Sequence, residues 1–160
     1  MPFYWPTFFS KSPAWALFIP FFSLPPAHNW RRYWKDITKE WVFKAEEDFY
    51  SADLLLHAGE APIPDTACFH CQQCAEKYLK AYLQEHDVEF ERSHELMPLL
   101  LLCASRDAEF RSIKRELEKL NRFAVIVRYP GITIKADTAE EALNSTNRVR
   151  KFIRNKLNIK

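Results

Sequence analysis

Glycine occurs only twice in the 160 residues, which leaves few positions for the tight turns of β-hairpins. The same scarcity argues against nucleotide-binding loops, because these need several glycines to bring backbone amides close to phosphate. The remaining composition, with 48% hydrophobic and 28% charged residues, is that of a globular chain able to bury a core. We therefore expect one helical domain.

Apolar residues recur at intervals of three and four over most of the chain, which is the period of an amphipathic helix. The first such run ends at Gly59, a typical helix stop. A second helix is expected from a cap at Asp65 to about Gln84, and a third from a cap at Ser93 through Leu102. The residues expected to face the core in the first two helices are Trp41, Ala45, Phe49, Ala52, Leu56, Cys68, Cys71, Ala75, Tyr78, Leu79 and Tyr82.

The second half of the chain continues this pattern. A fourth helix, from about Phe110 to Val127, is closed by Pro130 and Gly131. Residues 138–141 have the capping-box pattern and open a fifth helix, after an extended piece at residues 132–135. Together these elements predict an all-α, up-and-down bundle of four to five helices. The core positions expected here are Ile113, Leu117, Leu120, Ala124, Ala142, Thr146, Val149, Ile153 and Leu157.

Residues 1–35 differ in composition from the rest. They contain no Asp or Glu, six of the ten prolines and half of the aromatic residues. The prolines prevent a long helix, and no apolar run is long enough to span a bilayer. Three interpretations stay open: an arm that packs on the domain or a partner, a targeting segment, or translated sequence upstream of the true start. We expect the helical domain to occupy residues 36–160.

The formal net charge of +2 gives no strong attraction to nucleic acid, so binding of nucleic acid stays an open question. The last helix gathers many cations, which we interpret as a solvated face or as favourable charge near a helix C-terminus. The four cysteines follow no secreted-type framework, so we expect reduced thiols in a cytoplasmic protein. The cations of the last helix are Arg148, Arg150, Lys151, Arg154, Lys156 and Lys160.

Cys68, Cys71 and Cys74, with His70 among them, have a spacing that suggests a metal or iron–sulfur site. On a continuous helix each step of three residues advances by about 300°, so the three sulfurs spread over about 120°. The turn that a thiolate site normally uses is missing. Buried cysteines that act as small apolar residues are the better account, and we expect neither a metal nor a cofactor.

Gln73, Glu76, Lys77 and Lys80 form a polar flank on the same helix, at spacings of one to four residues. One interpretation is a solvated face, in which a Glu76–Lys80 pair contributes roughly 0.2–0.5 kcal/mol. The other is a groove in which amides read a base and lysines meet phosphate. Both interpretations stay open.

Three further residues are candidates for a ligand site. His94 is expected at the first position of the third helix, where backbone amides favour an anion, although it could equally dock a loop. Arg128 and Tyr129 precede the proline that ends the fourth helix and are not needed for that stop. Arg128 could bind helix carbonyls or clamp a phosphate with two hydrogen bonds.

Four blocks of the chain resemble, in order and spacing, the HEPN domain family, a helical bundle associated with nucleotide binding. They are Lys44-Ala45-Glu46-Glu47-Asp48, residues 67–80, Ser93-His94-Glu95-Leu96 and residues 124–131, which end in Arg128-Tyr129-Pro130-Gly131. The resemblance covers about residues 37–157. It implies the fold more strongly than it implies any one activity.

Many members of that family are ribonucleases with an Arg-x4–6-His motif, in which paired protomers act on a ribose 2′-hydroxyl. In this chain no histidine lies four to six residues after an arginine, and none follows Arg128. We therefore expect no catalytic residues. An alternative is a divergent ribonuclease site built from His94, Arg128 and Tyr129, and another is a purely structural dimerisation module.

The family members that this chain most resembles are short stand-alone domains, often encoded beside a minimal nucleotidyltransferase. The resemblance therefore implies a homodimer and, more weakly, a partner of that kind in a toxin–antitoxin-like pair. Because it includes the positions of the polar flank, the resemblance also supports a nucleotide-binding role for that flank beside the solvated-face interpretation. No membrane association is expected.

Overall fold

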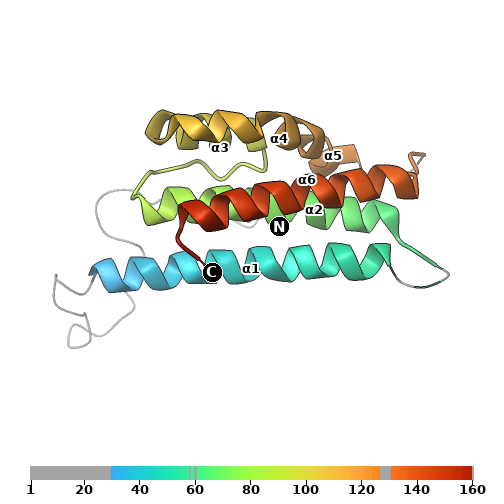
Figure 1. Ribbon diagram of the computed structural model, residues 1–160, viewed down its shortest axis with the longest axis horizontal. Helices are drawn as coiled ribbons and strands as arrows, with labels where there is room; N and C mark the ends of the chain where they lie inside the picture. Colours follow the sequence, from blue (N-terminus) through green and yellow to red (C-terminus); the bar gives the residue numbers. More distant parts are fainter. Residues whose placement is uncertain (1–29, 58, 60, 127–130, 160) are drawn as a thin grey trace, which may run out of the picture. The chain divides into compact units, whose positions relative to one another are not determined.

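The computed structural model describes residues 30–57, 59, 61–126 and 131–159, and within this part the chain is helical with no strand (Figure 1). The predicted all-α bundle is confirmed. No helix in the described ranges is long and apolar enough to cross a membrane. In chain order the elements are α1 (Trp30–Leu56), α2 (Pro64–Glu85), α3 (Leu96–Arg106), the 3₁₀ helix η3 (Ala108–Ile113), α4 (Lys114–Asn121), α5 (Phe123–Ile126) and α6 (Ala136–Lys156).

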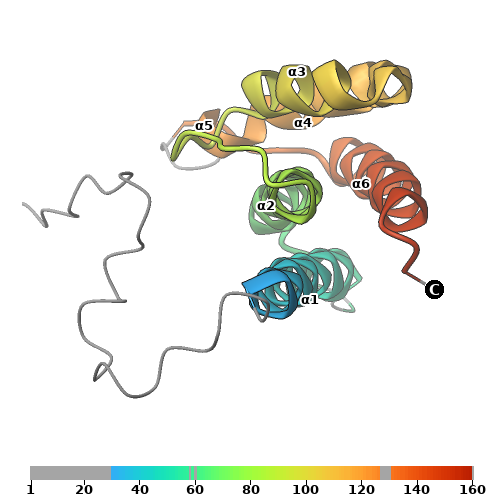
Figure 2. The same ribbon diagram turned by 90° about the vertical axis from the view of Figure 1, so that its left-hand side faces the viewer.

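Helix α2 is the centre of the compact unit formed by residues 34–160. It packs against α3, α4, α5 and α6, and its side chains bond to α1 on the remaining side (Figure 2). This position explains why 13 of its 22 residues are buried, far more than the stripe of a surface helix. The six residues predicted to face the core from this helix are all buried: Cys68, Cys71, Ala75, Tyr78, Leu79 and Tyr82.

The cysteines serve as small core residues, as predicted. Cys68, Cys71, Cys74 and Cys103 are fully buried free thiols. Burial raises the pKa of Cys68, Cys71 and Cys103 to about 12 and raises that of Cys74 well above its usual value. All four therefore stay protonated at neutral pH and make poor nucleophiles.

Most of the other predicted core positions are also buried. Ala45, Ala52 and Leu56 of α1 are buried, while Trp41 and Phe49 are half-buried against the same core. In α6, Ala142, Thr146, Val149 and Ile153 are buried, and Leu157, directly after the helix, is half-buried.

Helix α2 does not begin with the predicted cap at Asp65. The helix starts at Pro64, and Asp65 lies in its first turn. Its carboxylate instead accepts a hydrogen bond from the backbone N–H of Ile134, at 2.6 Å. This contact ties the non-helical segment before α6 to the start of α2. Asp65 does not cap α2 because its carboxylate binds Ile134, which is distant in the sequence.

Helix α3 begins at Leu96, so the prediction that it starts at a Ser93 cap is wrong. Ser93 forms a local turn in which its hydroxyl accepts from the N–H of Glu95. The first amide of the helix, that of Leu96, donates to the side chain of Asn121 at 2.8 Å. A residue from another helix therefore supplies the cap, and His94 lies ahead of the helix rather than at its first position.

The predicted fourth helix is divided into η3, α4 and α5. Asp107 caps η3 by accepting from the N–H of Glu109. Helix α4 ends at Asn121, the residue whose side chain holds the start of α3, and α5 resumes at Phe123. Val127 to Pro130 lie outside the described residues.

The predicted capping box at residues 138–141 is also wrong. Helix α6 begins at Ala136, so Thr138 is already its third residue and makes no cap. Residues 132–135 are non-helical, as expected, and Ile134 among them is buried. Gly131 precedes them at a φ of +94°, a conformation that favours glycine.

The burial of the thiols gives a simple prediction. In the folded protein the four cysteines should react with Ellman's reagent far more slowly than a free thiol, because neither solvent nor thiolate is available. In denaturant all four should react quickly. The check is absorbance at neutral pH with and without guanidinium. Rapid reaction of two or more thiols in the native state would contradict this packing.

Candidate functional site

Three acidic residues, Glu46 and Asp48 on α1 and Glu76 on α2, face the interior between helices. Each is matched by cations or hydrogen-bond donors from other elements. A buried carboxylate is costly unless it is paired. Many polar residues of the domain therefore serve as ion-pair or hydrogen-bond partners of these three groups.

Glu76 is the centre of the most deeply buried of the three clusters. Its side chain is 4% exposed and accepts from Lys80 Nζ at 2.7 Å. His94 Nδ1 lies 3.2 Å from both carboxylate oxygens, and Gln73 Nε2 donates at 3.3 Å. The structure thus brings together four of the predicted site residues. It does not support the solvated face proposed for this flank, because Glu76 and Lys80 are buried.

Aromatic rings cover the cation of this cluster. The Lys80 ammonium lies 5.7 Å from the ring centre of Trp41 and 5.9 Å from that of Phe90. Such contacts favour a cation that has left water. The imidazole of His94, by contrast, remains 64% exposed and is the part of the cluster that a ligand could reach.

Gln72 belongs to this cluster and was missed in the sequence. It is fully buried, and its Nε2 donates to the carbonyl of His94 at 2.9 Å and to Glu76 at 3.2 Å. The sequence pattern already placed Gln72 on the apolar side of the helix, because it stands four residues after Cys68 and three before Ala75. A polar residue in a core stripe indicates a buried partner.

Lys77, which was grouped with the polar flank, belongs to a different cluster. It donates to Asp48 of α1, whose other oxygen lies 2.8 Å from His70 Nδ1. Lys77 and His70 are 22% and 27% exposed, and the carboxylate between them is 12% exposed. Lys77 therefore neutralises an internal carboxylate and connects α2 to α1.

Glu46 is the anchor for α6. Arg150 binds both oxygens of its carboxylate at 2.7 Å, Arg154 donates at 3.1 Å, and the hydroxyl of Tyr78 donates from α2. Burial opposes ionisation of Glu46, but the hydrogen bonds from Arg150 and Tyr78 outweigh it and hold the pKa of this carboxyl below its usual value.

Much of the basic strip of the last helix is therefore structural. Arg150 and Arg154 bind Glu46, and Lys156 lies 2.6 Å from Asp107 and 2.8 Å from Glu109. The Lys156 hydrogen bond lowers the pKa of Asp107. Only part of the strip, including the exposed Lys151, faces solvent without an ion pair among the described residues.

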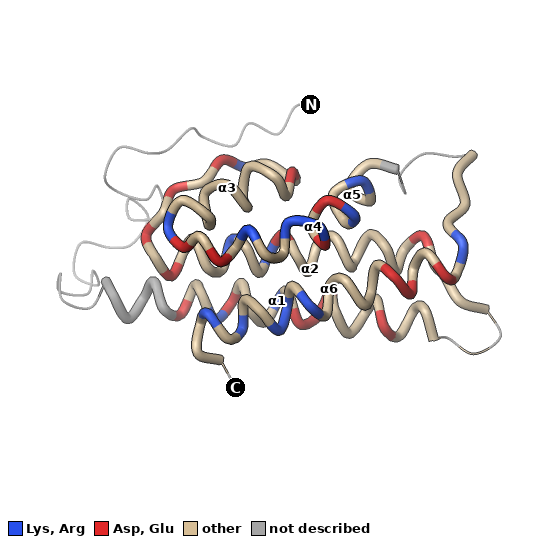
Figure 3. Tube along the Cα trace, turned by 45° about the horizontal axis from the view of Figure 1, so that its top comes forward, with Lys and Arg blue, Asp and Glu red and all other residues tan. Residues whose placement is uncertain are grey.

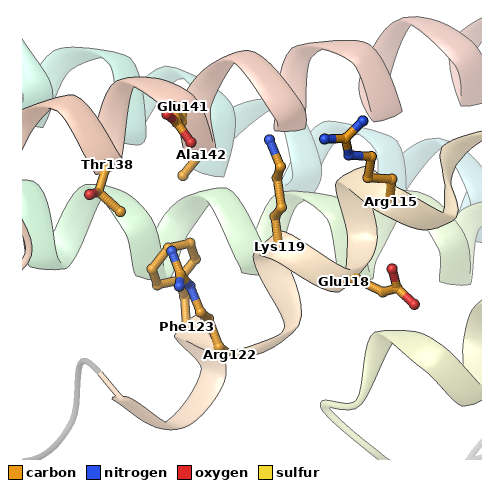
Figure 4. A pocket seen from close by; sticks show the side chains of 8 residues that line it. All are labelled: Arg115, Glu118, Lys119, Arg122, Phe123, Thr138, Glu141 and Ala142. Carbon is orange, nitrogen blue, oxygen red and sulfur yellow. The ribbon is translucent and has the colours of Figure 1, made fainter.

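A pocket of about 420 Å³ lies between α4 and α6. One wall carries Arg115 and Lys119, which lie four residues apart on one face of α4, and Arg122, which directly follows the helix. The opposite wall carries Thr138 and Glu141 of α6 (Figure 4). The remaining lining residues are Glu118, Phe123 and Ala142.

The three cations of this pocket differ from those of α2 and α6. Within the described part of the chain, no carboxylate lies within ion-pair distance of Arg115, Lys119 or Arg122. Lys119 extends toward α6, whereas the carboxylate of Glu118 points away from the other side chains (Figure 4). Lys and Arg recur along α4 toward α5 (Figure 3). This surplus of positive charge was not identified in the sequence, although the spacing of the residues was visible.

The remaining predicted residues, Arg128 and Tyr129, lie outside the described residues. Their part in a site stays a prediction. Among the described residues there is also no group of three or more His, Cys, Asp or Glu arranged to hold a metal ion.

The HEPN domain family matches residues 38–156 of the chain. This protein belongs to the HEPN family. The crystal structure of an archaeal HEPN homologue aligns with a TM-score of 0.57 and 25% sequence identity, covering 74% of this chain and 96% of that chain. No significant match was found among curated proteins. The HEPN fold and the family resemblance expected from the four sequence blocks are confirmed.

The buried Glu76–Lys80 pair of this HEPN domain gives a prediction for stability. Lys80→Met should lower the free energy of unfolding by about 3–5 kcal/mol, because it leaves a buried carboxylate without its cation. The double variant Glu76→Gln, Lys80→Met should recover part of that loss. The check is urea unfolding followed by circular dichroism.

The matched control for this experiment is Lys39→Met. Lys39 forms a similar short-range pair with Asp36 on α1, but its side chain is 77% exposed. The loss there should be about 0.5 kcal/mol or less. Equal losses for the two lysines would contradict the burial of the Glu76 cluster.

The Glu46 anchor gives a prediction for pH dependence. Because the pKa of Glu46 is lowered in the folded state, its ionised form stabilises the fold above its ordinary pKa of about 4.5. That contribution is lost as the pH falls from 4.5 through the lowered value. The stability difference between wild type and Glu46→Gln should therefore be constant from pH 5 to 7 and shrink below pH 4.5. A difference that grows on acidification would contradict the anchor.

Proposed function

We propose that this HEPN protein is a non-catalytic nucleotide-binding module whose α4–α6 pocket takes the phosphates of the ligand. The observation that carries the proposal is the set of three cations on one wall of that pocket that form no ion pair with another residue in the described part of the chain. A pocket of about 420 Å³ falls within the range of about 300–1,000 Å³ that small-molecule sites occupy.

The chemistry of the two walls fits a nucleotide. Arg115 and Arg122 offer planar guanidinium groups that bind phosphate oxygens with two hydrogen bonds, and Lys119 adds a point charge between them. On the other wall, the hydroxyl of Thr138 and the carboxylate of Glu141 accept hydrogen bonds from ribose hydroxyls or base amino groups. The pocket thus combines an anion-binding side with an acceptor side.

The polar flank of α2 is less suited to this role than its sequence suggested. Lys80 and Lys77 already neutralise Glu76 and Asp48, so a phosphate that recruited either lysine would leave a carboxylate unpaired. Ligand binding there would have to compete with an internal ion pair. A phosphate that binds the pocket cations breaks no ion pair among the described residues.

The absence of catalysis is proposed from the residue types. The sequence lacks the Arg-x4–6-His motif of HEPN ribonucleases, and no histidine is among the described residues that line the pocket. His94 is the most exposed of the described residues in the Glu76 cluster, and its Nδ1 faces a carboxylate. A single exposed imidazole is not accompanied there by a nucleophile.

The resemblance extends the proposal to a partner. In the related stand-alone HEPN domains a minimal nucleotidyltransferase supplies the catalytic carboxylates, and we propose that this protein works with such an enzyme in a toxin–antitoxin-like pair. In that arrangement the HEPN protein binds the nucleotide or the partner and leaves the chemistry to the enzyme. Support for this step comes from the family alone.

Calorimetric titration with ATP, GTP, their diphosphates and the uncharged nucleosides tests the pocket. Phosphate-bearing ligands should bind and nucleosides should bind far more weakly. The double variant Lys119→Ala, Arg122→Ala should weaken binding at least about tenfold, since each charge-assisted hydrogen bond contributes about 1.5–3 kcal/mol.

Lys151→Ala is the matched control, because Lys151 is an exposed cation of α6 outside the pocket. Its affinity should equal that of wild type. No binding of any nucleotide, or equal weakening by both sets of substitutions, would sink the proposal.

A further inference from the structure

The two ends of the α4–α6 pocket differ in chemistry. Arg115 lies at one end and Thr138 of α6 lies at the other, with Lys119 between them (Figure 4). The proposed function places phosphate beside Arg115 and Lys119. The end at Thr138 is therefore left for the base or the ribose of the ligand.

Four residues line this second end, which we call the Thr138 end: Thr138, Glu141, Ala142 and Phe123. Ala142 and Phe123 supply the apolar part of the wall and are held in the core, at 3% and 2% exposed. Thr138 is half-buried and Glu141 is exposed, so their polar groups remain within reach of a ligand. The Thr138 end thus combines a fixed apolar surface, against which a flat ring can lie, with two polar groups.

Glu141 differs from the acid next to it in the sequence. Glu140 lies 3.1 Å from Nε2 of His57, so its carboxylate already has a partner. Glu141 forms no ion pair with another residue in the described part of the chain, although three cations line the same pocket. An ionised carboxylate only accepts hydrogen bonds, and its two oxygens lie side by side. Glu141 therefore suits a ligand edge that presents two neighbouring donors.

Among the common bases, guanine has such an edge. Its N1–H and its N2 amino group are neighbours, and the O6 acceptor follows them. Adenine and cytosine set a single amino group beside a ring nitrogen that accepts, and uracil sets one N–H between two carbonyls. Each of these three bases would turn an acceptor toward the carboxylate, which leaves that acceptor without a hydrogen bond.

Thr138 supplies the group that the third position of guanine needs. It precedes Glu141 by three residues on α6, so the two side chains share a face of the helix. A hydroxyl donates as well as accepts, and here it can donate to O6. The two residues together offer one donor and two acceptors, the complement of the guanine edge.

From this match we propose that Glu141 and Thr138 make the pocket specific for guanine nucleotides. Glu141 accepts hydrogen bonds from N1–H and the N2 amino group, and Thr138 donates to O6. The proposal rests on the proposed function, because it assigns the base of the nucleotide whose phosphates the pocket cations bind.

A ribose at the Thr138 end would use these groups differently. A carboxylate also accepts from two neighbouring hydroxyls, but the sugar is the same whichever base it carries. Ribose binding there would give equal affinity for all nucleoside triphosphates. The preference among bases therefore distinguishes the two arrangements.

Calorimetric titration of the full chain with GTP, ATP and ITP tests the preference. GTP should bind about tenfold more tightly than ATP, which is the order of discrimination that a bidentate contact to a base provides. ITP keeps O6 and N1–H but lacks the N2 amino group, so its affinity should lie between the other two.

Glu141→Gln tests the assigned residue. An amide offers one acceptor and one donor, which matches xanthine, where N1–H lies beside a carbonyl at C2. The variant should lose the preference for GTP over ATP and should bind XTP more tightly than GTP. Removing a negative charge strengthens the binding of every triphosphate, but this effect cancels in the ratio of two affinities. A gain of XTP binding also cannot result from misfolding.

Glu118→Gln is the matched control, because it removes the same charge from the same pocket. Glu118 lies 3.5 Å from Lys114, and its carboxylate points away from the other pocket side chains (Figure 4). This variant should keep the wild-type ratio of GTP to ATP affinity.

The possible outcomes separate this proposal from the proposed function. Equal affinity of wild type for GTP and ATP overturns the guanine preference and leaves phosphate binding in place. Binding of neither nucleotide overturns both. An unchanged preference in Glu141→Gln, or the same loss of preference in Glu118→Gln, overturns the role of Glu141.

Discussion

The contact of Arg150 with Glu46 joins two side chains 104 residues apart and connects the first long helix to the last. Tyr78 donates to the same carboxylate from the central helix, so α1, α2 and α6 meet on one charged group. Sliding any of these helices by one turn, about 5.4 Å, would separate the partners and leave a partly buried charge unmatched. Apolar packing alone tolerates small shifts better, because it is not directional. The carboxylate clusters of Glu46, Asp48 and Glu76 therefore determine which turn of each helix faces which neighbour.

This internal use of charge separates the cations of the domain into two kinds. Lys77, Lys80 and Arg150 balance carboxylates within the bundle, so their replacement changes stability before it changes any binding. The three pocket cations Arg115, Lys119 and Arg122 form no ion pair with another described residue and can be replaced with little effect on the fold. A change in ligand binding on substitution can therefore be attributed to a direct contact only for the pocket cations, because replacing the paired cations also changes stability. The distinction follows from contacts between helices, which no local sequence window contains.

The sequence predicted the helices and the buried stripe of α2 well, because both depend on the periodicity of nearby residues. It predicted helix starts poorly. Asp65 and Ser93 have the chemistry of caps, but Asp65 binds the amide of Ile134, 69 residues away, and the start of α3 is held by Asn121. The Glu76–Lys80 spacing looks the same on a solvated helix as on a buried one, and only the packing of Trp41 and Phe90 distinguishes them. The pocket could not be predicted from the sequence, because it forms only where α6 lies opposite α4, and the spacing of residues along the chain does not indicate that two helices are neighbours.

The position of the pocket also determines how a ligand would act on the bundle. Helix α4 has only eight residues, follows a 3₁₀ helix and is separated from α5 at residue 122, so its own hydrogen bonds hold it weakly. It is nevertheless part of the core, because Leu117 and Leu120 are fully buried. An anion held between the α4 cations and α6 would add a contact where the backbone is least continuous. Binding at that place stabilises the folded state as a whole, since α4 cannot detach without exposing those leucines.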